Sequence, residues 1–334
     1  MTYVIIGYIY KLVMIRTPAQ QKDLQIFSKL VLQLIIPVYT FRIFVKVDRL
    51  PAESWIDMVV FAVLEILSAI VGSFIFRKLD YEKWVTLYVT MFSYSTGVFF
   101  YPILDQIVGA ESIANMIMFD IPNNIVMYVL FPLLFLYVKI KTAANGERPS
   151  KKEIALKIVK LVVTNVMLMS ILISLICFAA GLKLPVWIDN LLEKVSRTLT
   201  FVGMTIMGML LDLHPRLVLK NIRWVGVTML AHFGVGAVVA VFNYFVVFPH
   251  VSAATRVIIF LGPFMPPPVA AGVFTVDNGY DPFLTGLVIN TSTVVSFFII
   301  WALFTTVNFG DDISSSSSSS MLFNISSSSS SSSS

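Results

Sequence analysis

Long runs of apolar residues alternate with short polar or Pro/Gly-containing stretches along almost the whole chain. Most of these runs are long enough for a helix that crosses ~30 Å of hydrocarbon, which takes ~20 residues. A helix also satisfies its own backbone hydrogen bonds, as hydrocarbon requires. The pattern therefore predicts an all-α polytopic membrane protein with ten transmembrane helices, at residues 3–15, 25–46, 55–76, 84–108, 113–139, 157–181, 188–212, 222–248, 254–276 and 281–306.

The composition agrees with this class. The 334 residues are 57% hydrophobic and 13% charged, with a mean hydropathy of +0.85, whereas soluble proteins have about 25% charged residues. The single cysteine, Cys177, lies inside an apolar run, which excludes an intramolecular disulfide framework and a cysteine-based zinc site. The net charge of +5 fits membrane topology better than nucleic-acid binding.

Lys and Arg gather on one side of the predicted topology, in the connections after the first, third, fifth and seventh segments. The positive-inside rule makes this side cytoplasmic. The longest connection between segments, KTAANGERPSKKE, falls between two groups of five. We therefore divide the chain into a first five-helix repeat (1–140), a cytoplasmic linker (141–153), a second five-helix repeat (154–306) and a disordered serine-rich tail (307–334). Because five is odd, the second repeat would be inverted relative to the first, as in many secondary transporters.

Two apolar segments contain helix-breaking residues at corresponding places in the two groups. The ninth segment reads LGPFMPPPVAAG, with Pro266, Pro267 and Pro268 in a row, and the fourth contains Gly97 and Pro102. Proline removes a backbone donor and clashes with the preceding turn. Paired interruptions of this kind are the best sequence pointer to a transport site, because their free backbone groups can bind a ligand. The alternative is a structural kink, since prolines are common in membrane helices.

Three stretches resemble the auxin efflux carrier (membrane transport protein) family, which includes the plant PIN-FORMED and PIN-LIKES carriers and bacterial malate permeases. They are IIGYIYKLVMIRTPAQQKDLQIFSKLVLQLIIPVYTF, STGVFFYPI, and FMPPPVAAGVFTVDNGYDPFLTGLVINTSTVVSFFIIWAL. The second is similar to the family's N-x-G-x-x-x-x-P motif in helix four, and the third to its helix nine and ten region. The resemblance covers nearly the whole chain to about residue 306.

The resemblance implies ten helices in two inverted five-helix repeats, with broken helices four and nine crossing at the substrate site. By position, it assigns substrate binding to Gly97 and Pro102 and to the three prolines at 266–268. The family's helix four asparagine is replaced by Ser95, a shorter donor with one hydrogen to give. This departure puts auxin specificity in doubt more than the fold. We add Asn290 to the candidate binding residues, because its segment would support the crossing.

Ionisable residues inside apolar segments are functional candidates by default. Glu65 would carry a coupling proton or hold helices together, and His232 would relay protons or pack. Asp120, Asn123 and Asn124 would line the pathway or form the start of a helix near the outer end of the fifth segment.

Three further polar residues have structural interpretations. We expect Arg42 to snorkel to the membrane interface, and Asn165 and Asn243 to bond neighbouring helices.

These features predict a secondary transporter, an efflux carrier of a weak organic acid anion such as auxin or a dicarboxylate, working by alternating access. The apolar wall of its site would include Phe99, Phe100 and Phe264. The alternatives are a sodium-coupled organic anion symporter, which needs a cation cage at the crossing, and an anion sensor that does not transport. No P-loop, H-E-x-x-H or G-x-S-x-G motif is present, so we expect no enzyme, no cofactor and no metal.

We expect the protein to lie in the plasma membrane or the endoplasmic reticulum. Its partners would be the organic anion and the lipid bilayer, with a homodimer as a further expectation and no nucleic acid.

Overall fold

The computed structural model describes residues 2–14, 34–43, 45–46, 53–107, 113–142, 151–210 and 219–307. These residues are helical, with no β-strand among them. Residues 25–33 of the second predicted span, 143–150 of the predicted linker and 308–334 of the predicted tail lie outside them.

The first part of the chain, up to Thr142, forms helices and contains one non-helical stretch inside a predicted span. In chain order they are α1 (Thr2–Met14), α3 (Ser54–Phe76), α4 (Tyr81–Tyr88), the π-helical turn η1 (Thr96–Phe100), α5 (Tyr101–Ile107), α6 (Ile113–Ile125), the π-helical turn η3 (Val126–Leu130) and α7 (Phe131–Thr142). A further helical stretch covers 34–43. Residues 89–95 separate α4 from η1 and belong to no helix.

The second part contains a second interruption. Its elements are α8 (Lys151–Thr164), α9 (Val166–Ala179), α10 (Val186–Leu210), α12 (Ile222–Phe242), the π-helical turn η4 (Asn243–Val247), the 3₁₀ turns η5 (Phe248–His250) and η6 (Gly262–Phe264), α13 (Ala253–Leu261), α14 (Val269–Asp277) and α15 (Pro282–Thr306). Residues 265–268 separate η6 from α14.

Five stretches of the described chain are long and apolar enough to cross a membrane. They are Ser54–Phe76, Asn115–Lys139, Ile222–His250, Ala253–Thr275 and Phe283–Thr306. Each coincides with a span predicted above, so the structure supports an all-helical integral membrane protein. Ten spans and an inverted repeat stay predictions.

One span that was predicted as continuous, 157–181, is interrupted. The span 157–181 is divided at Asn165, which has extended backbone (φ −85°, ψ 112°) and caps α9 by accepting a hydrogen bond from Leu168 N–H at 2.9 Å. The guanidinium of Arg42 binds Asp189 at 2.8 Å and Glu193 at 2.7 Å, and its position at the membrane interface stays a prediction. The span 84–108 is divided at 89–95.

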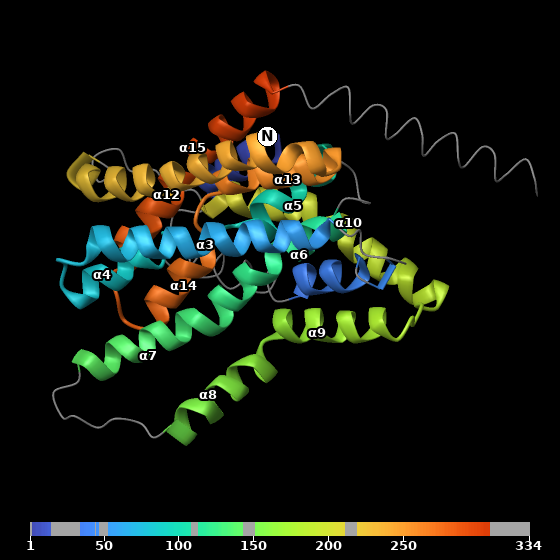
Figure 1. Cartoon of the computed structure of the whole chain (residues 1–334), viewed down its shortest axis with the longest axis horizontal. Coiled ribbons are helices and arrows are strands. Elements are labelled where there is room, and N and C mark those ends of the chain that lie inside the picture. Colours follow the sequence, from blue (N-terminus) through green and yellow to red (C-terminus); the bar gives the residue numbers. More distant parts are fainter. Residues whose placement is uncertain are drawn as a thin grey trace, which may run out of the picture.

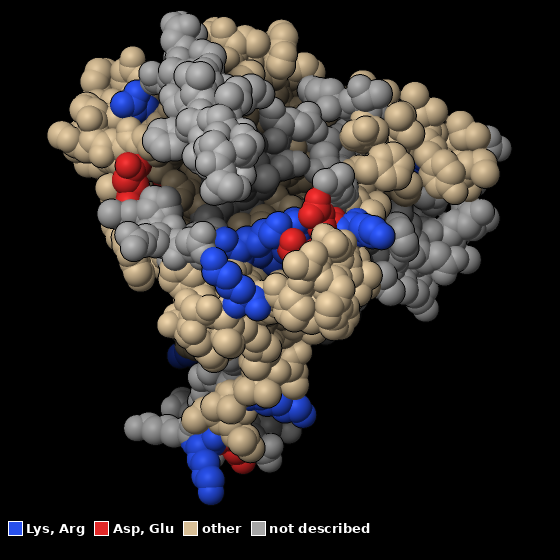
Figure 2. Space-filling model, turned by 90° about the vertical axis from the view of Figure 1, so that its right-hand side faces the viewer, with Lys and Arg blue, Asp and Glu red and all other residues tan. Residues whose placement is uncertain are grey.

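The helices are inclined to one another rather than forming a parallel bundle. In Figure 1, α3 and α12 run across the view, whereas α7 and α8 slope away below them. α3 packs against α6 and α12, and α1 packs against α10. Among the residues that Figure 2 colours, most of this face is neither basic nor acidic, and basic and acidic side chains lie side by side near its middle.

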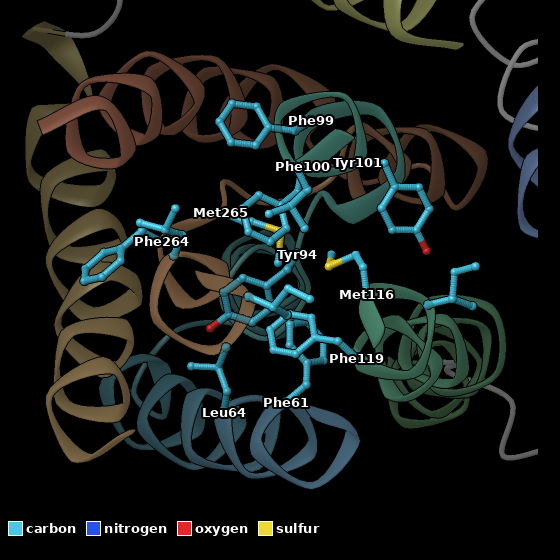
Figure 3. Close-up of a cluster of buried hydrophobic side chains, with 14 of the residues drawn as sticks. Phe61, Leu64, Tyr94, Phe99, Phe100, Tyr101, Met116, Phe119, Phe264 and Met265 are labelled. Carbon is cyan, nitrogen blue, oxygen red and sulfur yellow. The ribbon is translucent and has the colours of Figure 1, made fainter. Parts of the chain in front are cut away.

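The largest apolar core lies where the two interruptions meet. Tyr94 and Met265, one from each interruption, are fully buried near the middle of this core, between Phe61 and Leu64 on one side and Phe99 on the other (Figure 3). The fold therefore places both non-helical stretches in the interior.

Candidate functional site at the crossing of two interrupted segments

The first interruption, residues 89–95, contains neither glycine nor proline. It ends at Ser95, whose backbone (φ −85°, ψ 73°) is neither helical nor extended. Gly97 lies after the interruption in η1, and Pro102 lies in α5, which continues directly from η1. The prediction that Gly97 and Pro102 mark the break is therefore wrong by several residues.

A side-chain amide holds the first interruption open. Asn123 of α6 accepts a hydrogen bond from Tyr94 N–H at 3.1 Å and donates one to Tyr94 O at 2.8 Å. Buried backbone groups need partners, which a helix would otherwise supply. The amide of Asn123 replaces those partners for both backbone groups of one residue, Tyr94, so the chain can leave the helix inside an apolar core.

The second interruption is built by proline. Met265 is extended (φ −64°, ψ 147°), and the three prolines that follow have no N–H with which to continue a helix. A proline also disfavours helical backbone in the residue before it. The helix resumes at Val269, and Ala271 N–H bonds to Pro268 O at 3.0 Å.

The two interruptions are joined directly through their backbones. Ser95 N–H donates to Pro266 O at 2.8 Å. The imidazole of His232, on α12, lies against both, with Nδ1 3.0 Å from Met91 O and Nε2 2.9 Å from Met265 O. Segments more than 150 residues apart in the chain thus cross at one buried point.

A glycine allows α12 to approach this crossing closely. A Cβ at Gly236, one turn after His232, would lie 2.3 Å from Pro263 O. Gly234 has nothing within 4 Å of its Cβ position. Of these two glycines of α12, packing therefore requires only Gly236, which faces η6 just before the second interruption.

A buried carboxylate lies beside the crossing. Asp120 of α6 accepts hydrogen bonds from the Thr96 hydroxyl, from the Tyr101 hydroxyl at 2.9 Å and from Asn123 Nδ2 at 2.9 Å. Asn124 Nδ2 donates to the Asp120 backbone oxygen at 2.9 Å. These residues connect α6 to η1 and α5, so they form part of the crossing rather than the start of a helix.

A cavity of about 40 Å³ lies next to the crossing. It has room for a few water molecules, whereas pockets for organic ligands measure ~300–1,000 Å³. Its walls come from both interruptions and from α6, and they are Ile36, Tyr94, Ser95, Thr96, Gly97, Val98, Asp120, Asn124, Met127, Tyr128, Met167, Pro268, Val269 and Ala270.

The sequence-based candidates are placed unequally around this cavity. Ser95, Gly97 and Pro268 line it. Pro266 and Pro267, which are buried in the second interruption, are not part of its wall, and neither is Asn290 on α15. The expected apolar wall residues Phe99, Phe100 and Phe264 pack in the core instead.

Glu65 lies at a separate, larger pocket. Its side chain is 4% exposed, and Oε1 has no hydrogen-bond partner among the described residues. The pocket, about 530 Å³, is lined by apolar residues of α3, α6 and α7 together with Tyr88. One turn further along α3, the Ser68 hydroxyl lies 2.8 Å from the Tyr94 hydroxyl, which ties this helix to the first interruption.

Sequence reasoning missed the structural role of Asn123 and Gly236. The signal for Asn123 was present in FDIPNN, where three polar residues interrupt an apolar run, but nothing in the sequence identifies Tyr94 as their partner. Among the described residues, no group of three or more His, Cys, Asp or Glu side chains could hold a metal ion.

The sequence matches no protein-family model and no curated protein.

Proposed function

We propose that this protein is a secondary transporter that carries a weak organic acid anion by alternating access at the crossing. The hydrogen bond from Ser95 N–H to Pro266 O is the observation that supports this most strongly. In secondary transporters, two interrupted helices that meet near the middle of the membrane supply non-helical backbone groups at the substrate site. In this proposal the chain has ten spans in two inverted five-helix repeats, with its membrane either the plasma membrane or the endoplasmic reticulum.

The described conformation fits a closed state of such a cycle. The cavity of about 40 Å³ excludes an organic acid, so substrate binding requires the crossing to widen. Movement of the helices that carry 89–95 relative to those that carry 262–268 would enlarge it. The backbone bond between Ser95 and Pro266 is the contact most directly affected by that movement.

The substrate's carboxylate has a suitable position at the start of α14. Pro268, Val269 and Ala270 line the cavity, and the first N–H groups of a helix have no intrahelical partner. The positive end of the helix dipole adds to this preference for an anion. Asp120 lies on the same cavity, so its negative charge would oppose the substrate unless a proton is carried as well.

Asp120 also favours a second candidate, the coupling of transport to a cation. The sequence alone shows few carboxylates at the predicted crossing, whereas the fold brings Asp120 to it from α6. Thr96 and Asn124, whose side chains carry oxygen atoms, line the same space. This set is compatible with a sodium ion that enters together with the anion.

The test is flux through the purified protein in sealed vesicles. Labelled indole-3-acetate and labelled malate are followed under an imposed potential, with and without a sodium gradient. The Pro267→Ala variant restores a backbone donor inside the crossing, and Pro185→Ala provides a matched control, because Pro185 is exposed before α10.

Saturable flux of one acid that Pro267→Ala reduces at least about tenfold, and Pro185→Ala leaves unchanged, would support the proposal; tenfold corresponds to about 1.4 kcal/mol of barrier. Binding of an acid with no flux in tight vesicles would instead favour a sensor. Equal flux in both variants would remove the crossing as the transport site.

A further inference from the structure

The His232 side chain contacts a backbone carbonyl oxygen in each of the two interruptions. Its side chain is 1% exposed and extends from the middle of α12. Both of its ring nitrogens lie at hydrogen-bond distance from backbone carbonyl oxygens, Nδ1 from Met91 O and Nε2 from Met265 O. One carbonyl belongs to each interruption, so a single side chain bridges the crossing.

The two acceptors constrain the protonation state of the imidazole. A carbonyl oxygen only accepts hydrogen bonds, and a neutral imidazole has one N–H and one bare nitrogen. A neutral His232 could donate to one carbonyl, and it would leave a nitrogen lone pair about 3 Å from the other carbonyl oxygen. The imidazolium has two N–H donors and satisfies both contacts.

We propose that His232 is a proton-binding site that couples protonation to closure of the crossing. In the protonated form the imidazolium donates to Met91 O and Met265 O and holds the two interruptions together. When the proton leaves, one of the two hydrogen bonds is lost, and the two interruptions are free to separate. This inference rests on the proposed function and deepens it, because it names a proton as the coupling ion of the same site.

The surroundings of His232 contain few other charged groups. The Tyr94 ring lies 4.7 Å from the imidazole, ring centre to ring centre, and Phe233 meets it edge-on. On the helices packed nearby, the acidic residues are Glu65 and Asp57 on α3 and Asp120 on α6.

The basic residues of these elements are at helix ends. Arg256 is near the start of α13, where it binds backbone oxygens of Phe248 and Val251, and Arg223 is at the start of α12. The sequence of α15 has no charged residue.

The neighbouring carboxyl groups are placed differently with respect to the crossing. Asp120 already accepts from three side-chain donors, which lie in η1, α5 and α6 rather than in either interruption. Glu65 lines the pocket between α3, α6 and α7. Among these ionisable side chains of the described residues, His232 is the one that contacts a carbonyl in each interruption, so its proton is the one whose loss acts on both sides of the crossing.

The protonation state can be measured directly, because the chain has only three histidines, at 214, 232 and 250. The full-length protein, labelled with ¹⁵N in the histidine ring and placed in lipid nanodiscs, would be titrated between about pH 5 and pH 8, where histidine ordinarily changes charge. His214→Gln and His250→Gln assign the remaining signal by elimination, so that the assignment does not depend on a folded His232→Gln variant.

Amide hydrogen exchange of residues 89–98 and 262–269 would be followed over the same pH range, after correction for the intrinsic pH dependence of exchange. We expect His232 to carry a proton on both nitrogens at the acidic end of the range. As it loses one, exchange in both stretches should rise at least about tenfold with the same midpoint. His232→Gln should abolish this pH dependence, whereas His250→Gln should preserve it, because His250 is exposed at the end of η5.

Two results would overturn the inference. One is a neutral His232 with a single fixed tautomer throughout the range, and the other is loss of its proton with no change in exchange. Neither readout needs a transported substrate. A protonation-linked opening without flux of either acid would therefore retain the proton site and reject the transport proposal, and flux without such opening would do the reverse.

Discussion

The two interruptions differ in how the helix is broken. At 265–268 the chain breaks itself, because consecutive prolines lack the N–H groups that a helix needs. At 89–95 the chain has helix-compatible residues, and another helix breaks it from outside through Asn123. The break at the prolines follows from the covalent structure of its own segment, whereas the break at 89–95 forms only when α6 is packed against it.

This difference has a consequence for folding. The proline-containing segment cannot form a continuous helix at any stage, so its break precedes tertiary structure. The 89–95 segment forms its break when the partner helix packs against it, so its non-helical shape depends on a few buried hydrogen bonds. Substitutions at the contacts should therefore affect the two breaks unequally.

The largest effect is expected for Asn123→Ala. This change leaves the N–H and the C=O of Tyr94 without the partners described above, and each buried orphan group costs about 1–3 kcal/mol. We expect a loss of about 2–6 kcal/mol in unfolding free energy, measured by thermal or denaturant unfolding in detergent. Asn124→Ala, which removes one hydrogen bond to Asp120 O, is the matched control and should cost about 1 kcal/mol. Equal losses for the two variants would contradict a special role of Asn123.

Gly236→Ala should have the next largest effect. The added methyl would meet Pro263 O at 2.3 Å, and overpacking of a buried contact costs about 1–3 kcal/mol. Gly234→Ala meets nothing and should stabilise α12 by up to about 1 kcal/mol through its higher helix propensity. Melting temperatures of the two purified variants give the comparison, and a stable Gly236→Ala protein would show that α12 does not approach the second interruption as described.

Loss of the backbone hydrogen bond between the two interruptions should have a smaller effect on the free energy of unfolding. Ser95→Pro removes the N–H that binds Pro266 O, and the Ser95 φ of −85° is close to the value that proline adopts. A typical hydrogen bond contributes about 1 kcal/mol, so we expect that loss, whereas Ser95→Ala keeps the N–H and should cost less than about 0.5 kcal/mol. If Ser95→Ala were the more harmful change, the hydroxyl rather than the backbone would be the important group.

The smallest effect sets a baseline outside the crossing. Arg42→Gln weakens ion pairs to Asp189 and Glu193, whose side chains are 18% and 28% exposed. Partly exposed pairs contribute about 0.2–1 kcal/mol and weaken with salt. Unfolding measured at low and high salt should therefore show a difference between wild type and variant that shrinks as salt is added. A salt-independent loss larger than that of Asn123→Ala would mean that the crossing is not the main polar determinant of stability.

Much of the fold class follows from the sequence, because apolar runs and proline are read directly from it. The helical architecture, the five apolar helices and the interruption at Pro266 were predictable in this way. The position of the first break was not predictable. Gly97 and Pro102 are the helix-breaking residues of that segment, but Asn123, on another helix, determines where the break lies. Asn165 was also misread, because a polar residue in an apolar run is compatible with both a helix contact and a helix cap.

The candidate site was predictable to a similar degree. Ser95 and Pro268 line the cavity as their segments suggested, but Asp120 reaches it through the packing of α6. The bridge made by His232 depends on contacts 141 and 33 residues away, which no local pattern encodes. Such partners require the tertiary arrangement, because hydrogen-bond geometry is decided in three dimensions.

The π-helical turn η1 has a consequence for insertions and deletions. A π-helical turn accommodates one residue more than an α-helical turn. Removing one residue from Thr96–Phe100 would return this turn to α-helical hydrogen bonding, because the Tyr101 N–H, which now bonds to Thr96 O five residues before it, would then lie four residues after it. Tyr101 would keep its direction toward Asp120. Adding a residue would instead rotate the following helix by about 100°, so this stretch should tolerate a one-residue deletion better than a one-residue insertion.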